Sequence, residues 1–285
     1  MPEMLLIALV FTLAAAVIGW LFMTEASYLG SDAVRRFYDF GSRFYDASKV
    51  RLAVYRFSLE EDRKWLLPPL LPAIERDPHC RVLDVATGSG RVPLLLLGQP
   101  GFLGSIVGLD LSEGMLRVAR EKLGAWMQSG RVALVKQDAS YLPFEDEAFD
   151  VVSSTESWEF FPHPEKALGE MTRVLKPGGI LLLSKQRDSW ALWMYGRSFT
   201  RSRVAAMLEQ AGFTGIAIVD WQRRYDLAWG TKAGRPTPGP PEPPGPWDSL
   251  RCPVCQSQLL PSGQGLTCSQ CRGEYPIRRG ILYLA

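Results

Sequence analysis

Residues 81–91 read Arg-Val-Leu-Asp-Val-Ala-Thr-Gly-Ser-Gly-Arg, and this stretch decides the fold. Its first half predicts a short buried strand over residues 82–86, and its second half predicts a glycine turn that opens a helix. Gly88 and Gly90 lack a Cβ, so the backbone can turn tightly there and approach a ligand closely. The free N–H groups at the start of the helix favour an anionic group. These features are typical of a doubly wound nucleotide-binding fold.

Two details separate this stretch from a dinucleotide-binding fingerprint. That fingerprint needs a third small residue three positions after the second glycine, and this chain has Pro93 there. NAD and FAD are therefore not expected. Asp84 places an acid inside the strand, whereas a purely structural parallel strand is apolar throughout.

Further signals follow at regular positions along the chain. Asp110 ends a second predicted strand twenty residues after Gly90, where a ribose-binding carboxylate belongs. Later strands are expected to end at Gln137-Asp138-Ala139 and to cover residues 149–153, 180–183, 215–219 and 226–231. Because strands and helices alternate, the chain should form a parallel sheet covered on both faces.

The pattern Asp84-x-x-x-Gly88-x-Gly90, followed by Asp110 and Asp138, resembles motif I and its partners in the class I S-adenosylmethionine (SAM) dependent methyltransferases. The run Arg-Val-Leu-Lys-Pro-Gly-Gly at residues 173–179 resembles the ubiquinone/menaquinone-type (methyltransferase type 11-like) group of that family. The resemblance implies an α/β fold with a Rossmann-like, doubly wound, mostly parallel seven-stranded sheet whose last strand is antiparallel. It also implies an enzyme that transfers a methyl group from SAM, its co-substrate.

The resemblance further implies which residues bind SAM. The glycine turn with Asp84 would hold the methionine part, Asp110 would accept hydrogen bonds from the ribose, and Asp138 would accept one from the adenine amino group. The whole expected set is Asp84, Ala86, Thr87, Gly88, Gly90, Asp110, Leu111, Met115, Asp138 and Ala139, with Tyr38 and Tyr45 from an N-terminal helical segment that would cover the site. The alternatives are strand-end capping for Asp110 and Asp138, and packing on the sheet for the aromatic side chains of that segment.

The loops after the fourth and fifth strands should line the acceptor side of the site. The candidate residues in these loops are Glu156, Glu159, His163, Trp190, Trp193 and Tyr195. Glu159 is the predicted general base if the reaction needs one, and His163 is interpreted as an ordinary surface residue. The three aromatic residues line an apolar pocket, lie at a membrane interface or belong to the core.

The N-terminal stretch over residues 4–23 carries no charge. As a helix it would be about 30 Å long, which matches the hydrocarbon thickness of a bilayer. A cleaved signal peptide would have a basic start, whereas this chain begins Met-Pro-Glu. Arg35, Arg36 and Arg43 follow the stretch, so the positive-inside rule predicts a single-pass membrane protein with its catalytic domain in the cytoplasm. Residues 1–26 are thus expected to be a transmembrane anchor, with a signal peptide or a core helix as alternatives.

The C-terminal part predicts a separate metal module. Residues 234–248 are rich in proline and should form an extended linker. Residues 249–285 carry two Cys-x2-Cys knuckles that suit a structural Zn²⁺, namely Cys252, Cys255, Cys268 and Cys271. Two disulfides are the alternative. This part resembles the Trm112-like zinc-ribbon family, members of which pair with methyltransferases that modify tRNA, ribosomal RNA and a release factor.

Together these features predict a methyltransferase domain over residues 27–233 that acts on a small, lipid-soluble acceptor such as a quinone or isoprenoid precursor. The alternative is an RNA or protein substrate, with the zinc ribbon as a recognition or activating module. A net charge of +2 does not favour nucleic acid over other partners. A regulatory protein without turnover is the third hypothesis, and the intact motif with Asp110 and Asp138 argues against it.

Overall fold

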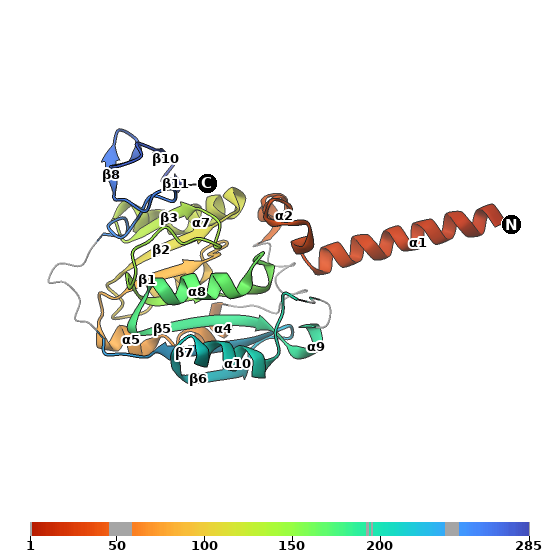
Figure 1. Ribbon diagram of the computed structural model, residues 1–285, viewed down its shortest axis with the longest axis horizontal. Coiled ribbons are helices and arrows are strands. Elements are labelled where there is room, and N and C mark those ends of the chain that lie inside the picture. The colour runs from red at the N-terminus through yellow and green to blue at the C-terminus, as the bar shows by residue number, and fades with distance from the viewer. Residues whose placement is uncertain (1, 46–58, 192–193, 195, 237–244, 285) are drawn as a thin grey trace.

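The computed structural model describes residues 2–45, 59–191, 194, 196–236 and 245–284. The described strands form one mixed sheet in the order β6-β7-β5-β4-β1-β2-β3-β11-β10-β9-β8 (Figure 1). The strands are β1 (Arg81–Val85), β2 (Ser105–Asp110), β3 (Val132–Lys136), β4 (Phe149–Ser154), β5 (Leu175–Gln186), β6 (Phe213–Asp220), β7 (Tyr225–Lys232), β8 (Leu259–Ser262), β9 (Gly265–Cys268), β10 (Glu274–Arg278) and β11 (Ile281–Tyr283).

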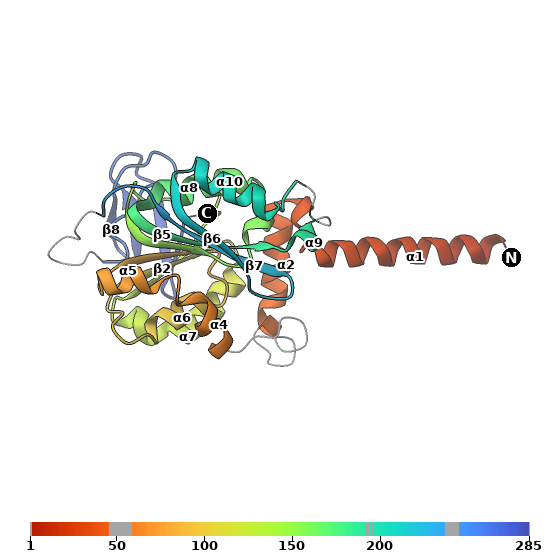
Figure 2. The same cartoon turned by 90° about the horizontal axis from the view of Figure 1, so that it is seen from below.

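Helices cover both faces of the sheet, as Figure 2 shows from its edge. The helices α4, α5, α6 and α7 lie on one face, and α8 and α10 lie on the other. The helical elements are α1 (Pro2–Met23), η1 (Ser27–Leu29), α2 (Ser31–Tyr45), α4 (Leu59–Leu66), α5 (Leu71–Arg76), α6 (Arg91–Leu97), α7 (Glu113–Gln128), η3 (Trp158–Phe160), α8 (Pro164–Val174), α9 (Asp188–Ala191) and α10 (Arg201–Gln210). One buried hydrophobic cluster fills the space on each side of the sheet.

The central strands follow the expected doubly wound pattern. β1 is parallel to β2 and β4, β2 is parallel to β3, and β4 is parallel to β5. Every residue of β1 is buried, which explains why apolar residues, Val82, Leu83 and Val85, flank Asp84 in this strand. β7 runs antiparallel between β5 and β6, so the predicted antiparallel last strand of the domain is confirmed.

The expected seven-stranded sheet is wrong in its extent. β11 pairs in parallel with β3, with Ile281 opposite Leu134 and Leu282 opposite Val135, and it carries β10, β9 and β8 into the same sheet. Without this partner β3 would be an edge strand with a row of unsatisfied backbone groups. The C-terminal module therefore continues the doubly wound sheet at its β3 edge.

Side chains and loops strengthen this junction. The backbone N–H of Arg251 donates to the carbonyl of Pro143 at 2.8 Å, and Arg251 also forms an ion pair with Glu145. Arg81 also holds the end of the predicted linker, because it donates to the carbonyl of Gly245 at 3.2 Å and to the hydroxyl of Ser249, just after the linker, at 3.0 Å. Residues 237–244 of the predicted linker lie outside the described part of the chain.

Helix α1 projects away from the rest of the described chain (Figure 1). Within it the stretch Met4–Leu21 is long and apolar enough to cross a membrane, and none of that stretch is buried against the protein. Length and composition of this kind also occur in signal sequences near an N-terminus. The prediction of an apolar N-terminal helix is therefore confirmed, and its membrane role remains a proposal.

Candidate functional site

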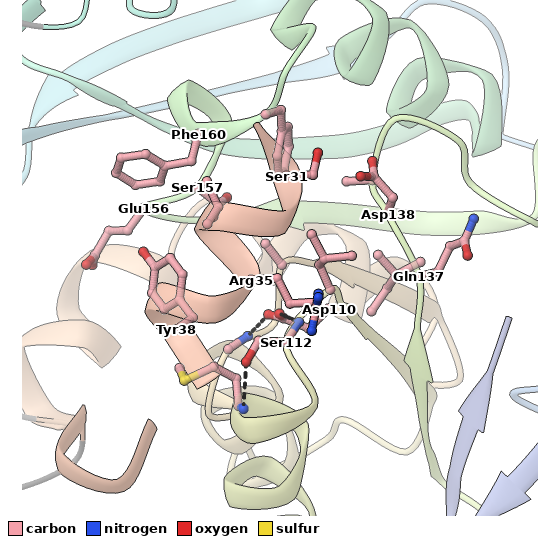
Figure 3. A pocket seen from close by; sticks show the side chains of 18 of the residues that line it. Ser31, Arg35, Tyr38, Asp110, Ser112, Gln137, Asp138, Glu156, Ser157 and Phe160 are labelled. Carbon is pink, nitrogen blue, oxygen red and sulfur yellow. Dashed lines mark hydrogen bonds between the residues drawn. The ribbon is translucent and has the colours of Figure 1, made fainter. Parts of the chain in front are cut away.

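A pocket lies at the carboxyl ends of β1, β2, β3 and β4, where a doubly wound sheet places its ligand. Figure 3 shows Tyr38, Glu156 and Phe160 at one end of the pocket and Gln137 and Asp138 at the other. The predicted SAM-binding residues that line it are Tyr38, Ala86, Gly88, Asp110, Leu111, Met115, Asp138 and Ala139. The pocket holds about 730 Å³ of empty space, part of it open to solvent.

Asp110 and the glycine turn form the floor of the pocket. One carboxylate oxygen of Asp110 accepts the N–H of Gly88 at 2.8 Å, and the other accepts the N–H of Ser112 at 2.8 Å. Burial raises the pKa of Asp110 to about 6, and these two backbone hydrogen bonds oppose the rise. Each carboxylate oxygen keeps a lone pair, so Asp110 can still accept hydrogen bonds from ribose hydroxyls.

Three predicted SAM ligands lie behind the pocket wall instead of lining it. Asp84 accepts hydrogen bonds from the hydroxyls of Thr87 at 2.7 Å and Ser153 at 2.6 Å, and burial raises its pKa to about 6. These bonds tie the turn after β1 to strand β4. Gly90 is the N-cap of α6 with a φ of 79°, and a Cβ there would lie 2.9 Å from Leu123. Asp84, Thr87 and Gly90 therefore shape the turn.

The end of β3 supplies the opposite end of the pocket. One carboxylate oxygen of Asp138 accepts the N–H of Ser140 at 2.7 Å. Gln137, which was not among the predicted ligands, also lines the pocket, and its buried Oε1 has no hydrogen-bond partner among the described residues. A buried unpaired acceptor of this kind fits a ligand with an amino group, such as adenine. Its place beside Asp138 at a strand end was the only signal in the sequence.

Helix α2 covers the pocket and is anchored to α7. Asp39 accepts hydrogen bonds from the Ser112 hydroxyl at 2.7 Å and from the Gly114 N–H at 2.8 Å. Ser112 also caps α7, because its hydroxyl accepts the N–H of Met115 at 3.1 Å. The prediction that this N-terminal segment covers the site is consistent with Tyr38 in the pocket lining, whereas the side chain of Tyr45 lies outside the described part of the structure.

Glu156 occupies the other end of the pocket in an uncommon backbone conformation. Its φ is 56°, in the left-handed region, where a residue other than glycine is strained. Its carboxylate accepts hydrogen bonds from Arg91 at 2.7 Å and Gln222 at 3.0 Å. Arg91 also pairs with the buried Asp62 at 3.2 Å. This network fixes the Glu156 carboxylate in place.

The predicted base Glu159 is only 2% exposed and does not line the pocket. Burial raises its pKa to about 7, while Tyr225 and Arg224 favour its charged form. His163 is exposed, as predicted for a surface residue. Trp190 is half-buried beneath the Arg224 guanidinium at 5.1 Å, and Trp193 and Tyr195 fall outside the described residues.

The four cysteines of the C-terminal module come together as predicted. The Sγ atoms of Cys252, Cys255, Cys268 and Cys271 all lie within 4.8 Å of one another. The closest pairs are 3.3 and 3.5 Å apart, so the described residues contain no disulfide here. Sulfur atoms around a tetrahedral ion with bonds of about 2.3 Å are separated by about 3.8 Å. The donor set and its spacing therefore fit a metal ion.

The fold and the position of this pocket define a Rossmann-like α/β protein with a ligand site at the carboxyl ends of its strands. A methyltransferase-domain family model matches residues 83–183. A demethylmenaquinone methyltransferase of Thermus thermophilus is 40% identical over 127 residues, 44% of this chain and 56% of that protein. A demethylmenaquinone methyltransferase of Bacillus cereus is 33% identical over 173 residues, 50% of this chain and 73% of that protein.

The chain belongs to the SAM-dependent methyltransferase family. It also matches the ubiquinone/menaquinone biosynthesis C-methyltransferase UbiE of Ectopseudomonas mendocina, with 42% identity over 37% of this chain and 41% of that protein. The predicted resemblance to quinone-type methyltransferases is thus confirmed for the catalytic domain. The chain spans about half the length of these curated relatives from Thermus and Ectopseudomonas.

Solved structures show the same fold. A SAM-dependent methyltransferase from Aquifex aeolicus superposes with a TM-score of 0.50 at 21% identity, covering 68% of this chain and 97% of that chain. The [4+2]-cyclase SpnF superposes with a TM-score of 0.55 at 21% identity, covering 71% of this chain and 96% of that chain. Because the cyclase shares the fold, the fold alone does not define the reaction.

Proposed function

We propose that this protein is a membrane-anchored methyltransferase that moves the methyl group of SAM to a small, lipid-soluble acceptor of the reduced-quinone type. The observation that carries the proposal is the continuity of the apolar helix α1 with the pocket cover α2, through the short segment of residues 24–30. An acceptor held in a bilayer would therefore meet the pocket close to the point where the chain leaves the membrane. The quinone-type relatives support the same acceptor class.

Contacts at the base of α1 support an anchor that stays attached to the domain. Trp20 stacks on Tyr28 with ring centroids 5.1 Å apart, and the Arg197 guanidinium lies 5.0 Å from the centre of the Tyr28 ring. Arg224 donates to the carbonyl of Met23 at 3.4 Å. A signal sequence destined for cleavage has no need of such packing. The basic residues that follow α1 support a catalytic domain on the cytoplasmic side of the membrane.

SAM in this pocket supplies an activated methyl group, so the protein has mainly to hold and align the reactants and to exclude water. We assign the ribose to Asp110, the adenine to Gln137, Asp138 and Ala139, and the methionine part to the turn at Ala86 and Gly88. The methyl group would then lie toward Tyr38 and Glu156, at the other end of the pocket. Asp84, Thr87 and Gly90 support the turn from behind.

We assign Zn²⁺ to the four cysteines, in a structural role. The module adds its β11 to the sheet beside β3, and β3 leads directly into Gln137 and Asp138 of the pocket. This arrangement supports stabilisation of the catalytic domain over recognition of RNA or protein by the module.

The experiment uses the full-length protein in detergent or vesicles with methyl-labelled SAM and a membrane-containing cell extract. The extract is then separated into lipid, RNA and protein fractions. Label in the lipid fraction is the expected result. The Asp110→Asn variant, measured in the same way, gives the background level of labelling. Label confined to RNA or protein would refute the lipid-soluble acceptor and favour the macromolecular alternative.

A further inference from the structure

The segment that joins the apolar helix to the pocket cover buries a carboxyl group that the methyltransferase motifs do not explain. Thr24, Glu25 and Ser27 are 0%, 6% and 1% exposed, although residues 4–20 of the helix before them are exposed. Glu25 and Ala26 have φ values of 51° and 56°. Two successive left-handed residues other than glycine cost free energy, so the tight turn that directs Glu25 inward has a structural or functional reason.

The side chain of Tyr38 connects Glu25 to the pocket. The hydroxyl of Tyr38 donates a hydrogen bond to the Glu25 carboxylate, and Tyr38 lines the pocket. A phenol hydroxyl both donates and accepts, so Tyr38 can accept a hydrogen bond from a ligand in the pocket while it donates to Glu25. Glu25 itself does not line the pocket. The two residues therefore form a path from the pocket to a buried carboxylate.

The other acids at this end of the pocket are less suited to accept a proton from a ligand. Glu156 already accepts hydrogen bonds from Arg91 and Gln222. Glu159 lies behind the pocket wall. Asp110 and Asp138 belong to the end that we assign to the nucleoside.

We propose that Tyr38 and Glu25 form a proton relay that takes the hydroxyl proton of a phenol- or hydroquinone-type acceptor during methyl transfer. This inference rests on the proposed function and narrows its acceptor to compounds with an acidic ring hydroxyl. Tyr38 contacts the acceptor, and Glu25 is a positioning residue that acts through Tyr38. Tyr38, which the family resemblance assigned to SAM, is thus assigned to the acceptor in this proposal. Both residues come from the segment attached to the apolar helix, so the membrane-proximal part of the chain would supply part of the acceptor site.

The atoms and electrons of the step balance. The acceptor hydroxyl gives its proton to the Tyr38 oxygen as the Tyr38 proton moves to Glu25. The electron pair left on the acceptor increases the electron density of its ring carbon, which forms the new bond to the methyl group. The bond between sulfur and methyl breaks, and its electrons remain on sulfur. The ring C–H proton then moves to the ring oxygen, and Glu25 releases its proton to solvent.

The surroundings of Glu25 predict the pH dependence of the relay. Burial raises the pKa of Glu25 to about 8, the hydrogen bond from Tyr38 and the charge of Arg224 oppose the rise, and Glu159 and Glu156 add to it. The hydrogen-bonding group thus comes from α2, and the charged groups come from the turn before β7 and from the segment after β4. Glu25 accepts a proton only when ionised, so kcat should rise with pH up to about 8 and then level off.

The test measures methyl transfer by full-length protein in vesicles that contain a prenylated 1,4-naphthohydroquinone, kept reduced under anaerobic conditions. Glu25→Gln and Tyr38→Phe should each lower kcat about 100-fold or more, as loss of a proton acceptor does. Glu25→Gln should also remove the rise of kcat with pH. The double variant should lose little more than either single variant, because both residues serve one path. Glu209→Gln, an exposed acid on α10, is the control.

A second measurement, the thermal stability of the SAM-free protein, does not depend on turnover. The raised pKa means that folded Glu25 holds a proton which the unfolded chain releases, so wild-type stability should fall between about pH 4.5 and 8. The stability of the Glu25→Gln variant should fall less over the same pH range. If Glu25→Gln and Tyr38→Phe transfer the methyl group at the wild-type rate and with the wild-type pH profile, the proposed relay is wrong, and the proposed function is unaffected. Wild-type protein that binds SAM but methylates no hydroquinone overturns both.

Discussion

Removal of one leucine side chain at the junction between the metal module and the catalytic domain should destabilise the whole catalytic fold. Leu282 is 0% exposed in β11, pairs with Val135 of β3 and belongs to the hydrophobic cluster that includes buried residues of α8 and α10. A fully buried Leu→Ala change costs about 2–5 kcal/mol. In a domain of this size that corresponds to a fall in melting temperature of about 5–15 °C.

The assay is thermal unfolding of the full-length protein in detergent, with zinc present and after treatment with a chelator. Leu260→Ala is the matched control, since this β8 side chain is 44% exposed and its loss should cost under about 0.5 kcal/mol. Chelation should lower the melting temperature of the catalytic domain as well, because metal binding stabilises only the folded module. Equal melting of Leu282→Ala and Leu260→Ala, or a catalytic transition that chelation leaves unchanged, would refute the reasoning.

Three further predictions concern the pocket. Asp110→Asn should weaken SAM binding about 10–100-fold by calorimetry, because it replaces a charged hydrogen-bond acceptor worth about 1.5–3 kcal/mol. Gly114→Ala would place a Cβ 2.6 Å from the Ser42 hydroxyl, so α2 should shift from α7 at a cost of about 1–3 kcal/mol and SAM should dissociate faster in stopped-flow experiments. Because the pKa of Glu159 is raised to about 7, wild-type stability should fall from about pH 4.5 to 7, and Glu159→Gln should remove up to about 3 kcal/mol of that fall in urea unfolding.

Each of these predictions has an outcome that contradicts it. Unchanged SAM affinity in Asp110→Asn would remove Asp110 from the SAM site, and Asp146→Asn, an exposed acid near β4, provides the control. If SAM dissociates from the Gly114→Ala variant at the wild-type rate, α2 does not retain the ligand. Identical pH profiles for wild type and Glu159→Gln would mean that the Glu159 carboxyl is solvated.

The catalytic fold could be predicted from the sequence because its signals are local. The glycine turn after β1 and the acid at the end of β2 each depend on neighbouring residues, and in the structure Asp110 accepts hydrogen bonds from the N–H groups of Gly88 and Ser112. The same signals did not separate Asp84, behind the pocket wall, from the residues that line it. That distinction depends on Ser153, which binds Asp84 from a strand far along the chain.

Other features depend on contacts that a single sequence does not reveal. The pairing of β11 with β3 joins residues far apart in the chain, so neither strand indicates its partner. Glu25 fell within the predicted anchor, residues 1–26, and nothing in the sequence indicated that its side chain is buried. Its burial follows from the left-handed turn at residues 25 and 26 and from its contact with Tyr38.

The pairing of β3 with β11 also has a consequence for synthesis of the protein. Ribosomes add about 5–20 residues per second, and β11 follows β3 by about 150 residues, so β3 waits about 8–30 s for its partner. During that time α1 has already left the ribosome, while β3 presents an open edge that can pair with another chain. Nascent chains should therefore be most prone to aggregate, and most dependent on chaperones, just before the cysteine module is complete.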